Sequence, residues 1–357
     1  MSEASDAARL AGETRALREE FGASVVIAAH HYQRPEIVAL ADFVGDSFML
    51  AREASRAKAE FIVLAGVRFM AESAAILAQE GQKVLIPDPA AGCPMADMID
   101  GPGAEAALEA IAAVCEAPVV PVTYMNSYAD VKSFTGAAGG SICTSSNAAT
   151  IVDYHLSRGR AVFFLPDRNL GQNTAAAMGI PEERVFTLRK GGKIEGLGDP
   201  KAGRIFLWDG WCHVHTNFTV AEVLGARKRY PGLRVIVHPE CEREVVAAAD
   251  ASGSTEAIYK AIRESPAGSR WAVGTEGSFV SRMAAEFPDK EVMHLRVATC
   301  FNMSRIGLSN LHASLASIKA FRASRSPLCF RVDVAEEHRR LASAALRSML
   351  DIVEART

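Results

Sequence analysis

Short apolar runs alternate with amphipathic segments through the first hundred residues. Four runs rich in β-branched or aromatic residues predict strands, and the segments between them carry apolar residues at helical spacing. The predicted strands lie at residues 25–29, 42–44, 61–65 and 83–86, and the helices at 35–40, 48–58 and 69–79. Strands that alternate with helices along a chain are typical of parallel sheets. The pattern therefore predicts α/β architecture.

The same pattern returns near the C-terminal third of the chain at matching distances. His30 and His238 each close a predicted strand, and a glycine stands 15 and again 36 positions after each of them. A cysteine follows 63 positions after His30 and 62 positions after His238. Landmarks that recur at these offsets indicate two copies of one structural unit.

A third copy with longer connections fits between these two. Its predicted strands are VVPVTY, SICTSS, AVFFLP and RIFLW, and an amphipathic helix introduces each copy, at residues 4–20, 105–116 and 219–230. Breaks at GPG (101–103) and YPG (230–232) separate helices from their neighbours. We therefore predict three similar three-layer α/β/α domains in a pseudo-threefold arrangement. Their bounds are 1–102, 103–217 and 218–307, and a helical tail at 308–357 packs back on the repeats.

Equivalent corners of the three copies carry polar side chains. Ligand groups collect beyond the carboxyl ends of parallel strands, and residues two apart on an extended segment share a face. The first strand of each copy ends in such a pair, and the second is followed by a hydroxyl that precedes a helix, where amides can help to bind carboxylate or phosphate. Singly, each histidine is more simply structural and each hydroxyl a helix cap; recurrence in three copies favours a shared site. The pairs are His30 with Tyr32, Tyr124 with Asn126 and His238 with Glu240, and the hydroxyls are Ser47, Ser145 and Thr255.

One cysteine follows the fourth predicted strand of every copy: Cys93, Cys212 and Cys300. Three thiolates that meet on an axis can bind three irons of a [4Fe-4S] cluster and leave the fourth iron open, and zinc on three cysteines is the alternative. We interpret the remaining cysteines differently. Cys115 and Cys329 are expected in the core, and Cys143 and Cys241 are expected beside the site but not as ligands, because their repeat counterparts are not thiols.

Composition and charge narrow the possible partners. The 357 residues are 49% hydrophobic with a formal net charge of -3, which argues against nucleic acid and anionic membranes as partners. No apolar run reaches the length of a membrane span, and the N-terminal segment lacks a basic-then-apolar signal. We therefore expect a cytoplasmic protein.

Nine segments in a fixed order resemble the quinolinate synthase family of bacterial NAD biosynthesis. They are AHHYQRPEIVALADFVGDS, GVRFMAESA, PDPAAGCPMAD, VTYMNSYADVK, CTSSNA, FLPDRNLG, HPEC, GTEGS and CFNM. The resemblance implies a transferase with three α/β domains around an oxygen-sensitive [4Fe-4S] cluster that acts as a Lewis acid. Such enzymes condense iminoaspartate with dihydroxyacetone phosphate to quinolinate, with loss of phosphate and water. An L-aspartate oxidase or dehydrogenase would supply the iminoaspartate.

The resemblance also assigns roles to the residues that the repeats select. Cys93, Cys212 and Cys300 would bind the cluster. Glu240 would be the general base, with His30 or Tyr124 as its partner in proton transfer. The substrate contacts would be His30, Tyr32, Ser47, Tyr124, Asn126, Ser145, His238 and Thr255.

Three features depart from the family pattern. Residues 135–140 look like an insertion before CTSS, and Phe301 and Ser304 stand where proline and lysine are common. Two other functions are weighed against this one. A hydroxymethylbutenyl diphosphate reductase also gathers three cysteines from α/β units, and an iron-sulfur sensor needs no catalysis; the HPEC segment and the dense polar corners argue against them.

Overall fold

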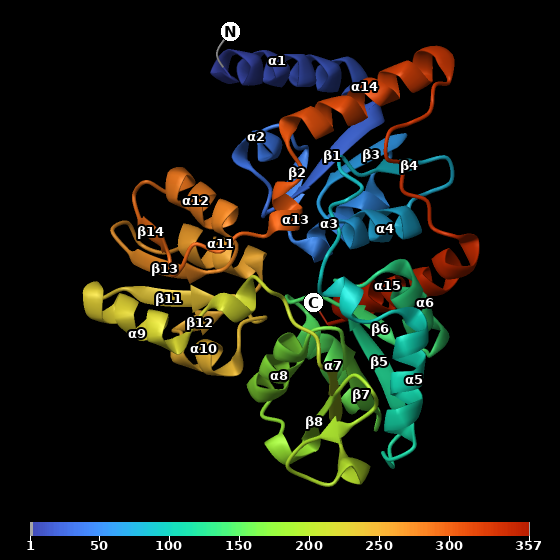
Figure 1. The fold of residues 1–357 in the computed structure, drawn as a ribbon, viewed down its shortest axis with the longest axis vertical. Coiled ribbons are helices and arrows are strands. Elements are labelled where there is room, and N and C mark those ends of the chain that lie inside the picture. The colour runs from blue at the N-terminus through green and yellow to red at the C-terminus, as the bar shows by residue number, and fades with distance from the viewer. Residues whose placement is uncertain (1–2, 357) are drawn as a thin grey trace. The chain divides into compact units, whose positions relative to one another are not determined.

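The computed structural model describes residues 3–356, and its strands form three sheets (Figure 1). The chain divides into two compact units. The first unit comprises the chain up to Cys93 together with Gly277–Arg282 and Thr299–Val334. The second comprises Pro94–Glu276, Met283–Ala298 and the chain from Ala335 onward.

The first unit is built on one parallel sheet with strand order β2-β1-β3-β4. Every residue of β3 is buried, and α14 packs against both α1 and β3. The strands are β1 (Val25–His30), β2 (Phe43–Gly45), β3 (Phe61–Ala65) and β4 (Lys83–Leu85). The helices are α1 (Glu3–Phe21), α2 (Pro35–Val38), α3 (Ser47–Arg56), α4 (Arg68–Leu77), α13 (Phe301–Ser304) and α14 (Leu308–Ser324).

The second unit holds two further sheets, with strand orders β6-β5-β7-β10-β8-β9 and β12-β11-β13-β14. The strands of the six-stranded sheet are β5 (Val119–Tyr124), β6 (Ser141–Cys143), β7 (Ala161–Leu165), β8 (Val185–Leu188), β9 (Ile194–Glu195) and β10 (Ile205–Trp208). Those of the other are β11 (Arg234–Val237), β12 (Ala251–Ser252), β13 (Arg270–Gly274) and β14 (Glu291–His294). The helices are α5 (Gly101–Ala112), α6 (Ala129–Ala137), α7 (Ala148–Leu156), α8 (Arg168–Ala177), α9 (Val220–Arg229), α10 (Arg243–Ala248), α11 (Thr255–Arg263) and α15 (Glu336–Glu354). Helix α12 (Gly277–Glu286) belongs to the first unit up to Arg282 and to the second from Met283.

The three sheets repeat one topology, which confirms the predicted fold class. In each, the first strand lies between the second and the third, and the fourth extends the sheet beyond the third. Local contacts repeat as well. The Ile27 amide donates to Asp42 Oδ2 at 2.8 Å in the first copy, and the Val235 amide donates to Asp250 Oδ2 at 2.7 Å in the last. An aspartate at the equivalent position, directly before the second strand, therefore links that strand to the first in both copies.

The structure differs from the sequence-based elements at two places in the second copy. Strands β8 and β9 extend its sheet beyond β10, and they were missed because they are short and flank a glycine turn. Helix α5 begins inside GPG instead of after it. Proline is tolerated in the first helical turn, and the Asp100 side chain accepts the Gly103 amide there.

The segment 135–140 forms no separate loop in the structure. It comprises the last turn of α6 and the turn that leads into β6. The helical tail divides at the segment between α14 and α15. Part of this segment extends the edge of the first sheet, because the Ile86 amide donates to Phe330 O at 3.1 Å and the Val332 amide to Val84 O at 2.8 Å. Helix α15 packs on α6, β6 and α7 of the second unit.

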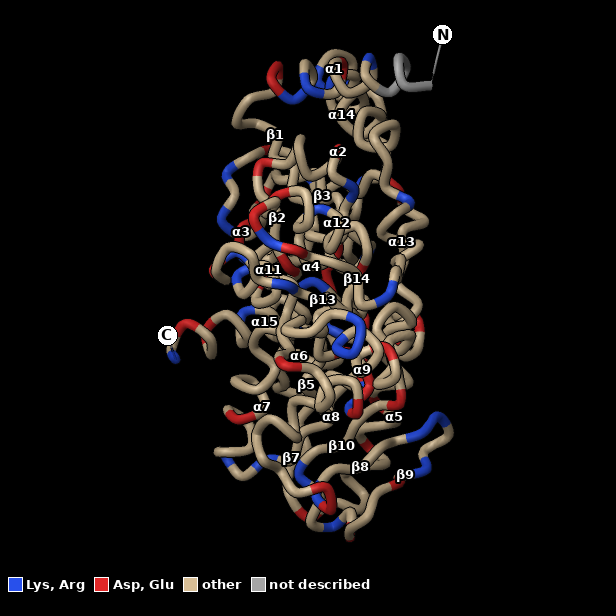
Figure 2. The backbone as a smooth tube through the Cα atoms, turned by 90° about the vertical axis from the view of Figure 1, so that its left-hand side faces the viewer, with Lys and Arg blue, Asp and Glu red and all other residues tan. Residues whose placement is uncertain are grey.

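Acidic and basic residues are interspersed along the backbone (Figure 2). Within the part of the chain that the structure describes, no helix is both long and apolar enough to cross a membrane.

Candidate active site

A buried carboxylate, Glu240, forms the centre of a hydrogen-bonded cluster in the second unit. Glu240 follows β11, is 2% exposed, and accepts a hydrogen bond from the Tyr124 hydroxyl at the end of β5 at 2.5 Å. Its other carboxylate oxygen lies 2.7 Å from Nδ1 of His215. The structure thus brings together Tyr124 and Glu240, which the sequence placed at equivalent strand ends.

His215 completes the cluster, and it was not among the residues selected from the sequence. An ionised carboxylate only accepts hydrogen bonds, so Nδ1 of His215 donates to Glu240. The Thr275 hydroxyl, directly after β13, lies 3.1 Å from Nε2 of the same ring. The sequence did hold a signal for both residues. His215 lies three positions after Cys212 in GWCHVH, and Thr275 follows Gly274, one of the repeat landmarks.

The surroundings of Glu240 keep it ionised and keep His238 neutral. Burial would raise the pKa of Glu240, but His215, His238 and the hydrogen bonds from His215 and Tyr124 outweigh burial and lower the pKa to about 2. Burial and the neighbouring His215 lower the pKa of His238 to about 3, although Glu240 opposes this. The rings of His215 and His238 stack with centroids 4.4 Å apart. At neutral pH the cluster therefore presents a carboxylate beside an uncharged imidazole.

The corresponding corner of the first unit has the same local geometry. The Tyr32 amide donates to Nδ1 of His30 at 3.2 Å, just as the Glu240 amide donates to Nδ1 of His238 at 3.4 Å. The rings of His30 and Tyr32 meet edge to face at 4.7 Å. His30 and His238, which the repeats place at equivalent positions, therefore form turns of the same kind. In each turn Nδ1 accepts a hydrogen bond, so the ring proton is on Nε2.

The hydroxyl corners are not simple helix caps. Asp46 caps α3 by accepting the Met49 amide, and Ser254 caps α11 by accepting the Ala257 amide. Ser47 and Thr255 are the first residues of these helices, so capping is done by their neighbours. This leaves their hydroxyls at helix N-termini, where a carboxylate or phosphate is favoured.

The same corner of the second copy contains unsatisfied polar atoms. Ser145 lies before α7 in the turn that Asn147 closes by accepting the Thr144 amide. Nδ2 of Asn147 and Oδ1 of Asn126 are buried and have no hydrogen-bond partner among the described residues. Buried polar groups without partners are uncommon and are often satisfied by a ligand. Asn126 and Ser145 stay predicted substrate contacts.

The seven cysteines fall into two groups by exposure. Cys93, Cys212 and Cys300 are partly exposed and each follows the last or, in the second copy, the equivalent strand of its repeat, whereas Cys115, Cys143 and Cys241 are buried. Cys329 is partly exposed, so its expected place in the core is wrong. Burial raises the pKa of Cys143 and Cys241 well above the usual value for a thiol, and Asp167 and Glu240 respectively add to the shift. Metal ligation requires the thiolate, and the surroundings of these two thiols disfavour that form.

Cys212 joins the cluster around Glu240. Its Sγ, a ring nitrogen of His215 and a carboxylate oxygen of Glu240 lie within 4.8 Å of one another. A thiolate, an imidazole and a carboxylate are ligand types that zinc and iron accept. Glu240 is hydrogen-bonded to His215 and Tyr124, and His215 also lies within hydrogen-bond distance of Thr275.

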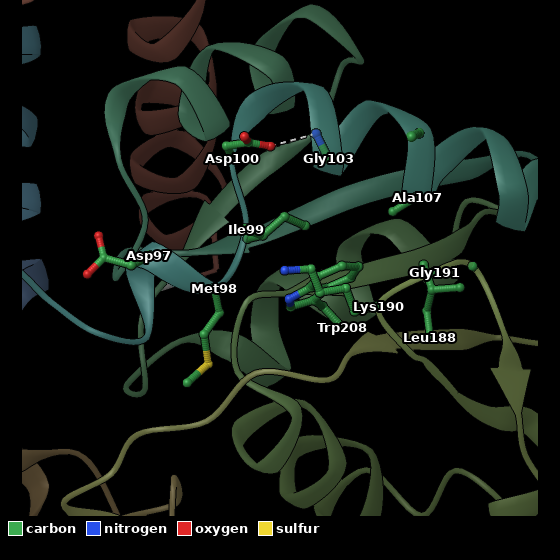
Figure 3. Close-up of a pocket in the computed structure, with 12 residues that line it drawn as sticks. Asp97, Met98, Ile99, Asp100, Gly103, Ala107, Leu188, Lys190, Gly191 and Trp208 are labelled. Atoms are coloured by element: carbon green, nitrogen blue, oxygen red, sulfur yellow. Dashed lines mark hydrogen bonds between the residues drawn. The ribbon is translucent and has the colours of Figure 1, made fainter.

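A separate cleft of about 490 Å³ lies beside α5 in the second unit (Figure 3). Asp97, Asp100, Lys190 and Trp208 line it, and none of the residues selected from the sequence does. The candidate active site is therefore the cluster around Glu240 and not this cleft.

The fold and the cluster define an α/β enzyme with a buried acid–base pair beside a cysteine. A family model described as quinolinate synthetase A protein matches residues 13–351. The chain therefore belongs to the quinolinate synthetase A family. This membership confirms the resemblance and the prediction of an enzyme. It argues against the two alternatives, a hydroxymethylbutenyl diphosphate reductase and an iron-sulfur sensor.

Curated relatives agree with this assignment. A quinolinate synthase of Streptomyces coelicolor is 45% identical over 353 residues, which cover 96% of this chain and 88% of the relative. One from Geobacillus sp. (strain WCH70) is 43% identical, covering 85% of this chain and 84% of the relative. One from Bacillus licheniformis is 44% identical, covering 87% and 85%.

Proposed function

We propose that this enzyme condenses iminoaspartate with dihydroxyacetone phosphate to quinolinate, with loss of phosphate and water, in the cytoplasm. The observation that carries this proposal is the buried Glu240 carboxylate, held between Tyr124 and His215 beside Cys212. Family membership supports quinolinate as the product. An L-aspartate oxidase or dehydrogenase would supply the iminoaspartate, which is a short-lived imine in water.

Cys93, Cys212 and Cys300 are proposed as the ligands of a [4Fe-4S] cluster. Their equivalent places in the three repeats and their partial exposure, in contrast to the buried Cys143 and Cys241, support this set. When bound, such a cluster supplies an iron without a protein thiolate, which is a Lewis acid for substrate oxygen or nitrogen. The proposed arrangement places the three domains, 1–102, 103–217 and 218–307, around it in pseudo-threefold symmetry, with the tail at 308–357 packed back on them.

Glu240 is proposed as the general base. Its pKa of about 2 keeps it ionised, and Tyr124 and His215 hold both of its oxygens in place. A carboxylate held in this way is ionised and positioned to accept a proton from a bound substrate. The Tyr124 hydroxyl, already hydrogen-bonded to Glu240, or Nε2 of His30 would pass the proton on.

The other selected residues are proposed to bind the substrates. The hydroxyls of Ser47, Ser145 and Thr255 lie where helix N-termini favour anions, which suits the two carboxylates and the phosphate. His30, Tyr32, Asn126 and His238 complete the set; neutral His238 and the unsatisfied amide oxygen of Asn126 can bind polar groups without adding charge.

Metal analysis tests the cluster. Protein purified without oxygen should carry about four irons and four sulfides per chain. Cys93→Ala, Cys212→Ala and Cys300→Ala should each abolish the cluster, whereas Cys115→Ala and Cys241→Ser should keep it. Stoichiometric zinc without sulfide, or loss of iron in Cys241→Ser equal to that in Cys300→Ala, would contradict the assignment.

Glu240→Gln tests the reaction. Glutamine preserves the shape and the acceptor for Tyr124 but removes the base, so quinolinate formation should fall roughly 10²- to 10⁴-fold while iron content stays normal. Glu195→Gln is the control, because Glu195 is a carboxylate of the same unit in a surface ion pair with Arg189. Near-normal turnover of Glu240→Gln with an intact cluster would remove Glu240 from the mechanism.

A further inference from the structure

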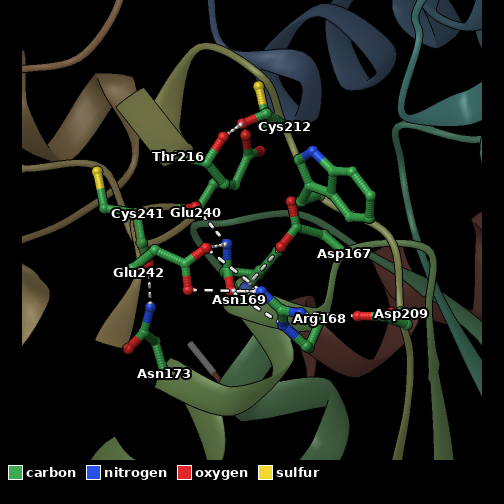
Figure 4. A network of polar contacts seen from close by, with 12 residues as sticks. Asp167, Arg168, Asn169, Asn173, Asp209, Cys212, Thr216, Glu240, Cys241 and Glu242 are labelled. Carbon is green, nitrogen blue, oxygen red and sulfur yellow. Dashed lines mark hydrogen bonds and ion pairs between the residues drawn. The ribbon is translucent and has the colours of Figure 1, made fainter. Parts of the chain in front are cut away.

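The turn that carries Glu240 is fixed by helix α8 of the neighbouring repeat. Nδ2 of Asn173 donates to the carbonyl oxygens of Pro239 and Cys241, at 2.8 Å each. These are the carbonyls on either side of Glu240. The two hydrogens of one amide group therefore bracket the residue that holds the carboxylate. Figure 4 shows Asn173 of α8 beside the segment that carries Glu240, Cys241 and Glu242.

A second asparagine of α8 contacts the carbonyl between these two. Nδ2 of Asn169 lies 3.3 Å from the carbonyl oxygen of Glu240 and 3.4 Å from Oε1 of Glu242. Arg168, the first residue of α8, contacts Glu242 as well, with its Nη2 at 3.3 Å from Oε1. Three successive carbonyls, at residues 239, 240 and 241, thus accept hydrogen bonds from one helix.

Both asparagines are buried, and their helix is firmly anchored. Asn169 is 0% exposed and Asn173 is 7% exposed. Helix α8 starts at Asp167, whose Oδ1 accepts the Leu170 amide at 2.8 Å. A buried amide that satisfies two carbonyls in a dry environment makes strong, directional contacts. Movement of the turn relative to α8 would leave all of these groups unsatisfied.

We propose that Asn173, assisted by Asn169, is a positioning residue that sets the direction of the Glu240 carboxylate. The clamp acts on the backbone and leaves the carboxylate itself to Tyr124 and His215. Asn169, in the FLPDRNLG segment, and Asn173, two residues after its end, lie one helical turn apart and therefore share the face of α8 that contacts HPEC. The catalytic part of this inference rests on the proposed function.

The chain offers a matched control for the loss of such a clamp. Nε2 of Gln82, in the first unit, donates to the carbonyl oxygens of Ala57 and Ala59, also at 2.8 Å each. These carbonyls precede β3 and lie at the amino end of that strand, whereas the selected site residues follow the carboxyl ends. Asn173→Ala and Gln82→Ala therefore remove the same two kinds of hydrogen bond, with different expected consequences.

The test compares kcat, KM, iron content and backbone hydrogen exchange for the two variants. In Asn173→Ala, kcat for quinolinate should fall about 10- to 100-fold with KM changed less than threefold, because a misplacement of about 1 Å has costs of that order. Amide exchange at Glu240 and Cys241 should accelerate, since the Cys241 amide is protected by a turn bond to His238 O. Gln82→Ala should lower the melting temperature and leave kcat and the exchange of this turn unchanged.

Two further variants grade the effect. Asn173→Ser keeps one donor in place of two and should fall between wild type and Asn173→Ala; it also carries the test if the alanine variant does not fold. Asn169→Ala, which removes longer contacts, should lose less activity than Asn173→Ala. Normal kcat in Asn173→Ala, or unchanged exchange at residues 240 and 241, overturns the proposal. If the wild type makes no quinolinate, the proposed function fails, while the exchange measurements still decide whether the clamp exists.

Discussion

A single added methyl group on α6 should destabilise the protein, against the usual effect of that change. Gly136 lies within α6 and faces α15, and a Cβ built there would be 1.9 Å from the carbonyl oxygen of Leu341. Replacement of glycine by alanine inside a helix normally stabilises by about 0.5–1 kcal/mol. Here the partner is helix backbone, which cannot rotate away as a side chain would.

The magnitude follows from the contact. Carbon and oxygen atoms that are not bonded approach to about 3.2 Å at closest, so α15 must shift by more than 1 Å at Leu341. Overpacking of this kind costs typically about 1–3 kcal/mol, and the helix gain offsets only part of it. We expect Gly136→Ala to lower the free energy of unfolding by about 1–2 kcal/mol.

Gly225→Ala is the matched control. Gly225 lies within α9, is exposed, and a Cβ there would meet no atom within 4 Å. It should raise the free energy of unfolding by about 0.5–1 kcal/mol. Urea unfolding and thermal midpoints of both variants, with iron content held equal, measure the difference. Limited proteolysis between α14 and α15 would show whether α15 detaches from α6.

The result that would refute this reasoning is a Gly136→Ala variant as stable as Gly225→Ala. If the segment before α15 resists protease equally in the Gly136→Ala and Gly225→Ala variants, α6 and α15 are not packed this closely. The closeness also bears on residues 135–140, which the sequence suggested were inserted. Gly136 within this segment is where α6 comes near the backbone of α15.

Two predictions concern pH. Burial, with the nearby Arg160 and Arg158, lowers the pKa of His155 to about 4, so as the pH falls below about 6.5 the unfolded chain takes up a proton that the folded one refuses, and stability is lost until about pH 4. His155→Gln, whose amide can still reach Ser141, should reduce this acid loss by at most about 3 kcal/mol; an unchanged slope of unfolding free energy against pH would contradict it. Burial and then the charge of Glu240 raise the pKa of Asp167, so the penalty appears as the pH rises above about 4, where only the unfolded carboxyl ionises. Asp167→Asn should therefore raise the melting temperature at pH 8 but not at pH 4, and a lower melting temperature at pH 8 would be the contrary result.

The repeat pattern predicts much of this fold because it rests on short-range rules. Each copy needs its first strand buried on both faces, so the apolar runs are continuous and easily recognised. The aspartates that join first to second strands, Asp42 and Asp250, keep one spacing because the strand pair has one geometry. The repeat pattern does not predict strands β8 and β9, because they extend the edge of one sheet and have no counterparts in the other two.

The candidate site is predicted less completely, for a physical reason. The polar pairs at the strand ends can be recognised from the sequence, because their members lie two residues apart at the end of the first strand of each copy. This pattern places Tyr124 and Glu240 at equivalent corners. His215 lies in a loop after β10, and Thr275 directly follows the third strand of its copy, where the other two copies have Gly66 and Pro166. Residues that differ in kind from copy to copy leave no repeat signal, although they occupy one structural position.

This variation between copies is what makes an acid–base site out of similar parts. A single copy has only one residue at each of these positions. The two hydrogen-bond donors to the Glu240 carboxylate therefore come from outside its own sheet. Tyr124 comes from the second copy, Glu240 and Thr275 from the third, and His215 from the connection between them. The clamp by Asn173 follows the same principle, because it joins α8 of the second copy to the turn of the third. Symmetry supplies the positions, and the departures from symmetry at those positions supply the chemistry.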